Sequence, residues 1–155
     1  MNTRRWLLVV LALCARAASA QSASELLAAI NVYRSASQSC DGARTAAAGT
    51  LTANTALAGQ SIESGDRLLD RLKVHGYRAA SAQLIMVSGL TSAGDVMKFI
   101  EPRYCRPLTN PLYTEIGVRR DADRWQIVLA RPLLSADLRD WREAGQEILR
   151  LTNAA

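Results

Sequence analysis

The chain has 155 residues, 49% of them hydrophobic, and a formal net charge of +5 at pH 7. Three of its 19 Lys and Arg residues, and none of its 14 acidic residues, lie in the first 20 positions, so the rest carries 16 basic and 14 acidic side chains. That balance excludes the electrostatic footprint of a nucleic-acid-binding protein. The remaining 135 residues are enough for one domain with one core.

The N-terminus (residues 1–20) has the pattern of a secretory signal peptide. Arg4 and Arg5 give a positive start, residues 6–13 form an apolar run, and residues 18–20 (Ala-Ser-Ala) resemble a cleavage site. The apolar run is far shorter than the roughly 20 residues that span a bilayer, so we expect no transmembrane anchor. The sequence therefore predicts a secreted or periplasmic protein, cleaved at the end of this segment.

Two cysteines remain after cleavage, because Cys14 leaves with the signal. In an oxidising compartment their default state is a disulfide, so we expect Cys40 to pair with Cys105. The alternative is two unpaired buried thiols. Two cysteines and a single histidine, His75, do not make a zinc site.

A first helix is predicted directly after the signal. Ser22 and Glu25 have the spacing of a capping box, and the helix should end within residues 35–39. Residues 41–60 predict a loop that leads into a short helix over residues 53–58. The apolar face of the first helix comprises Leu26, Leu27, Ile30 and Tyr33.

A second clear helix is predicted between Ser64 and Gly76. Ser64 is a suitable N-cap, Asp66 lies in the first turn, and Gly76 is a typical stop. His75 would interact favourably with the helix dipole at this end, and its functional alternative is a general base. The apolar face comprises Leu68, Leu69 and Leu72.

The second half of the chain predicts strands separated by a helix. Residues 83–88 indicate a buried strand. Ser92 and Asp95 have the spacing of a helix cap, and Pro102 should end that helix and begin a turn through residues 104–105. The buried face of the helix comprises Val96, Met97 and Ile100.

The last part of the core predicts a hairpin. Residues 114–119 and 125–131 flank a turn-like segment at 121–123, and Pro132 closes the second strand. Apolar residues alternate in that strand at Trp125, Ile127 and Leu129. A terminal helix over residues 137–151 places Leu138, Trp141, Gly145 and Ile148 on one stripe. This order of elements predicts an α+β fold in which helices cover a mixed sheet.

Four segments follow one another in an order that resembles a known family. They are residues 26–34 (LLAAINVYR), 65–78 (GDRLLDRLKVHGYR), 104–118 (YCRPLTNPLYTEIGV) and 125–133 (WQIVLARPL). Together they resemble bacterial members of the CAP family, which includes cysteine-rich secretory proteins, antigen 5 proteins and plant pathogenesis-related class 1 proteins. The third segment carries most of the resemblance.

The resemblance implies an α-β-α sandwich with a small mixed or antiparallel sheet over residues 21–134, and residues 135–155 as a C-terminal helical extension. Many family members hold a divalent metal between two histidines and two glutamates. This chain has one histidine, and Tyr104 stands where a family histidine commonly precedes the cysteine. We therefore expect no metal, no cofactor and no catalytic residue of the family type.

A small set of polar residues remains where the family cavity would lie. Arg103, Tyr104 and Arg106 could form an edge that binds an anion or another ligand, and Glu115 could pair with one of the arginines. The structural alternative is that Tyr104 packs beside the disulfide while the charged side chains face solvent.

These observations favour a non-catalytic exported domain that binds a lipid, a cell-wall component or an envelope protein. Two alternatives remain open. One is a secreted hydrolase that uses Ser81 or Ser88 with His75. The other is a small structural protein of the cell envelope whose terminal helix docks on a partner through Leu138, Trp141 and Ile148.

Overall fold

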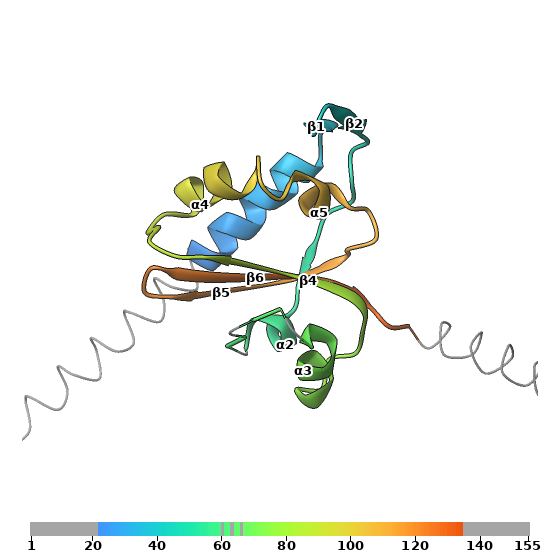
Figure 1. Ribbon diagram of the computed structural model, residues 1–155, viewed down its shortest axis with the longest axis vertical. Helices are drawn as coiled ribbons and strands as arrows, with labels where there is room; N and C mark the ends of the chain where they lie inside the picture. Colours follow the sequence, from blue (N-terminus) through green and yellow to red (C-terminus); the bar gives the residue numbers. More distant parts are fainter. Residues whose placement is uncertain (1–21, 60, 63, 66, 135–155) are drawn as a thin grey trace, which may run out of the picture.

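The computed structural model describes residues 22–59, 61–62, 64–65 and 67–134. The predicted signal peptide and the predicted terminal helix therefore lie outside the described residues. The described chain folds as α+β, as the order of elements predicted. Figure 1 shows a central sheet with helices on both of its faces.

The leading helix occupies residues 22–34 and is drawn in blue in Figure 1. The other elements are β1 (Gln38–Cys40), β2 (Ala43–Thr45), β3 (Thr52–Ala53), α2 (Thr55–Ala58), α3 (Leu68–Val74), β4 (Ala79–Val87), α4 (Ala93–Ile100), α5 (Cys105–Thr109), β5 (Glu115–Asp121) and β6 (Arg124–Pro132).

The main sheet has the strand order β3-β5-β6-β4. β3 runs parallel to β5 and pairs Thr52 with Glu115, while the other neighbours are antiparallel. β5 and β6 form the predicted hairpin, which turns at Ala122 with a left-handed φ of 55°. Because β3 has only two residues, it pairs with the start of β5 and leaves the rest of that edge without a strand partner among the described residues.

Each face of the sheet has its own apolar cluster, because helices cover both faces (Figure 1). The leading helix and α4 cover one face, where Ile30, Val96 and Ile100 pack against Trp125 and Ile127. On the other face, between the sheet and the helices α2 and α3, the cluster comprises Leu57, Ile62, Leu68, Leu72, Tyr77, Val128 and Ala130. The alternation in β6 predicted only the first buried face, whereas the strand is buried on both.

Several predicted helix boundaries are confirmed by hydrogen bonds. The Ser92 hydroxyl caps α4 by accepting the Asp95 N–H at 3.1 Å. Gly76 ends α3 with a φ of 81°, and its N–H donates to the Lys73 carbonyl at 3.0 Å. Ser22 is already helical in the structure, so the described residues do not test its predicted role as a cap of the leading helix.

The predicted start of α3 at Ser64 is wrong. The helix begins at Leu68, after Arg67 with a left-handed φ of 54° and no side-chain cap. The cause is a tether on the preceding segment, where the Ile62 N–H donates to Gln126 Oε1 at 2.7 Å and the Ile62 side chain is buried. This contact holds the segment against the sheet instead of in a helix. Asp66 lies outside the described residues.

Two strand predictions also need correction. The loop predicted over residues 41–60 contains the strands β2 and β3, and β2 forms a hairpin with β1 around Asp41 and Gly42, both with positive φ. Asp-Gly is a strong hairpin signal, so this turn could have been predicted from the sequence. β4 begins at Ala79, earlier than the predicted 83, because it pairs along almost the whole of β6.

Gly117 lets α2 approach β5, and its replacement gives a testable prediction. A Cβ added there would lie 2.6 Å from the Ala58 nitrogen and closer still to Leu57. These contacts include backbone atoms, which cannot move away by side-chain rotation. We therefore expect Gly117→Ala to lower the free energy of unfolding by about 3 kcal/mol, measured by urea denaturation. Gly49→Ala is the control, since nothing lies within 4 Å of the added Cβ. Equal stability of the two variants would contradict the packing of α2 on β5.

Candidate functional site

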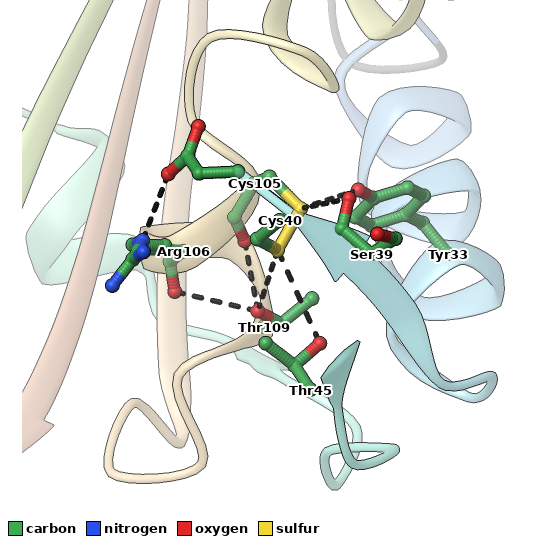
Figure 2. Close-up of polar contacts among 8 residues, drawn as sticks. Tyr33, Ser39, Cys40, Thr45, Cys105, Arg106 and Thr109 are labelled. Carbon is green, nitrogen blue, oxygen red and sulfur yellow. Dashed lines mark hydrogen bonds and ion pairs between the residues drawn. A yellow bond between two sulfur atoms is a disulfide. The ribbon is translucent and has the colours of Figure 1, made fainter. Parts of the chain in front are cut away.

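The predicted disulfide is present in the structure. It joins Cys40 at the end of β1 to Cys105 at the start of α5, with Cα atoms 5.5 Å apart (Figure 2). The Tyr33 hydroxyl donates to Cys105 Sγ at 3.1 Å. Burial, with a smaller contribution from the charge of Glu101, raises the pKa of Tyr33. The phenol therefore keeps the proton that it donates.

The two arginines of the predicted ligand edge each contact a partner within the domain. Arg106 Nε lies 2.8 Å from Asp41 Oδ2, and both side chains are mostly exposed. The Arg103 guanidinium lies 4.0 Å from the centroid of the Phe99 ring and donates to the Phe99 carbonyl. Binding of a ligand at this edge stays a prediction.

The other two members of the predicted edge lie on opposite sides of the sheet. Tyr104 precedes α5 and is half-buried against the cluster below the leading helix. Glu115 lies on the side of α2 and α3, where its Oε2 accepts the Tyr77 hydroxyl at 2.8 Å and the Asn54 amide at 2.7 Å. Glu115 is thus paired with these two residues and not with an arginine.

The contact between Tyr77 and Glu115 fixes the protonation of the phenol. Burial, followed by the hydrogen bond and the charge of Glu115, holds the pKa of Tyr77 well above its ordinary value. Tyr77 therefore stays a donor, and the carboxylate accepts two hydrogen bonds. The same carboxylate orients Asn54, whose Oδ1 caps α2 by accepting the Ala56 N–H.

Asn54 stands at the rim of an apolar groove of about 290 Å³. The groove lies where β5 continues beyond β3, between the leading helix and α2. Its apolar walls are formed by Ala23, Leu27, Ala53, Ala58, Ile116 and Val118. Its polar lining residues are Ser24, Asn54 and Thr55. Sequence reasoning missed this groove, because its walls come from three separate segments with no shared motif.

The residues proposed for hydrolysis are not joined in the described structure. His75 is exposed at the end of α3, Ser81 lies in β4 and Ser88 follows it. Among the described residues, no hydrogen bond connects the imidazole to either hydroxyl. Within the same ranges, no group of three or more His, Cys, Asp or Glu side chains could hold a metal ion.

Comparison with models of known protein families, with curated proteins and with solved structures found no match. No helix in the described part of the chain is long and apolar enough to cross a membrane. Its structural class is an α+β domain with one disulfide and an apolar groove at a sheet edge.

Proposed function

We propose that the chain is an exported, non-catalytic domain of the CAP type that binds the acyl chain of an envelope lipid in the groove beside Asn54. The observation that carries this proposal is the lining of the groove. Aliphatic and small side chains form most of its walls, and Asn54 is held at its rim by Glu115. Ligand sites are typically apolar with a few placed polar groups.

The lining favours a lipid over a cell-wall sugar. A sugar ring would need hydrogen-bond partners along its length, because polar groups buried without partners are costly. An acyl chain needs only apolar contact, and each buried methylene contributes about 0.8 kcal/mol. Affinity should therefore rise about fourfold per added methylene and level off when the groove is full.

The predicted export of the chain supports an envelope lipid as its ligand. The N-terminal signal pattern predicts passage into a compartment that borders the envelope, and the disulfide between Cys40 and Cys105 suits an oxidising compartment. The helical layers on both faces of the sheet agree with the sandwich that the CAP resemblance implies. An envelope protein or a cell-wall component remains the other class of ligand.

The test measures binding of fatty acids of increasing chain length to the mature protein by titration calorimetry. Ala53→Leu should fill part of the groove and weaken binding about tenfold or more, as expected when a wall residue blocks a preformed site. Ala43→Leu is the matched control, because Ala43 is also an exposed strand residue but lies in β2. The proposal fails if no chain length binds, or if both variants weaken binding equally.

A further inference from the structure

A second groove lies at the opposite edge of the sheet, between α3 and β4. It consists of two adjoining cavities of about 490 Å³ and 200 Å³, which share Leu69 and Asp70 as lining residues. The larger cavity extends over Ala82 and Leu84 of β4, and the smaller one reaches Leu133. We refer to the two together as the α3–β4 groove.

The α3–β4 groove has a mixed polar and apolar lining beside an outer strand. Leu69 is 44% exposed, and Ala82 and Leu84 are only partly buried. β4 is an outer strand of the sheet, and the sequence has no charged residue and no proline between Arg78 and Asp95. Outer strands are usually protected by charges, by proline, by bulges or by a covering segment. β4 has a register irregularity only at its start, between Ala79 and Ser81, so a covering segment would protect the rest of the strand.

The C-terminal segment leaves the sheet at one end of this groove. Leu133 lines the smaller cavity, and its N–H donates to the Arg78 carbonyl at 2.9 Å. The sequence predicts a helix over residues 137–151, which would be about 22 Å long. The floor of the groove from Ala79 to Leu84 extends about 17 Å. The segment is therefore long enough to cover the groove without a partner molecule.

The net charge of residues 135–155 is opposite in sign to that of the groove walls. The walls carry three basic residues, Arg67, Lys73 and Arg78, against Asp70 alone. Residues 135–155 contain four acidic and three basic side chains, and the apolar stripe of the predicted helix suits Leu69 and Leu84.

We propose that residues 135–155 fold back onto their own domain and cover the α3–β4 groove. The stripe of Leu138, Trp141 and Ile148 contacts Leu69 and Leu84. This inference is independent of lipid binding, because the acyl-chain groove lies at the opposite edge of the sheet.

Amide hydrogen exchange of the full mature chain tests this proposal. We expect residues 137–151 to exchange at least about tenfold more slowly than the same residues in a synthetic 135–155 peptide. Leu69→Glu should return their exchange to the rate of the peptide. Val74→Glu should leave it unchanged, because Val74 is 81% exposed on the same helix and lines neither cavity.

Three outcomes would overturn the proposal. The first is peptide-like exchange in the unsubstituted chain, and the second is an equal response to Leu69→Glu and Val74→Glu. The third is protection that grows with protein concentration, because a second copy would then be the occupant. Slow exchange of the buried β6 amides in each variant verifies that the domain is folded.

Discussion

Replacing Arg34 by methionine is expected to lower the free energy of unfolding by about 3–5 kcal/mol. Arg34 is 1% exposed, and its guanidinium donates to the carbonyls of Gly49, Leu108, Asn110 and Tyr113. Burial lowers the pKa of Arg34 from its ordinary value. Methionine preserves the apolar stem but removes the donor from four carbonyls, of which that of Leu108 is in a buried bond and that of Asn110 still accepts the Tyr113 N–H. Each buried group left without a partner costs roughly 1–3 kcal/mol.

Urea denaturation followed by circular dichroism measures this loss. Arg34→Lys is the informative intermediate, because it keeps the charge but cannot serve four carbonyls in the fork geometry of a guanidinium. Arg44→Met is the control, since Arg44 is exposed in β2 and its replacement should change stability by less than about 0.5 kcal/mol. Similar losses for Arg34→Met and Arg44→Met would contradict the structural role of Arg34.

Arg34 also shows where a sequence signal was present but not used. It follows Leu26 and Ile30 at intervals of four, so all three lie on one stripe of the leading helix. The sequence interpretation placed Tyr33 on that face and did not consider Arg34. Arginine is rarely buried. The structure buries Arg34 and leaves Tyr33 partly exposed. A charged residue that continues an apolar stripe therefore identifies a candidate buried donor.

Local signals predicted the elements whose boundaries depend on near neighbours. The cap at Ser92 and the helix end at Gly76 depend on residues within one helical turn, and both predictions are confirmed. The start of α3 depends instead on a bond between Ile62 and Gln126, which are 64 residues apart. No local pattern reports such a contact, so the predicted start at Ser64 was wrong.

The candidate site could not be predicted for the same reason. Asn54, Tyr77 and Glu115 come from three segments; the parallel pairing of β3 with β5 brings Asn54 to Glu115, and the segment between α3 and β4 brings Tyr77. The sequence identified Glu115 as a residue that could pair with an arginine or face solvent, whereas in the structure it accepts hydrogen bonds from Asn54 and Tyr77. The position of Glu115 in a strand could be predicted from the sequence. The face of the sheet to which its side chain points depends on the pleat of β5 and on the packing of Gly117 against α2.

Removing the disulfide is expected to destabilise the domain by about 4 kcal/mol, because Cys40 and Cys105 close a stretch of 65 residues. The bond restricts the unfolded chain, and in the folded state it anchors the β1–β2 hairpin to α5. The double variant Cys40→Ala, Cys105→Ala should therefore show a lower urea midpoint than the oxidised protein. Reduced wild-type protein should show a similar loss.

Hydrogen exchange separates these two effects of the disulfide. If the bond also anchors the hairpin, amides of residues 38–45 should lose protection in the double variant before the buried strand β6 does. The Arg106–Asp41 pair alone should not retain the hairpin, because both side chains are mostly exposed and such pairs contribute about 0–1 kcal/mol. A loss of stability below about 1 kcal/mol would show that the unfolded chain keeps these segments close without the bond. Unchanged protection of residues 38–45 would show that packing on α5 holds the hairpin.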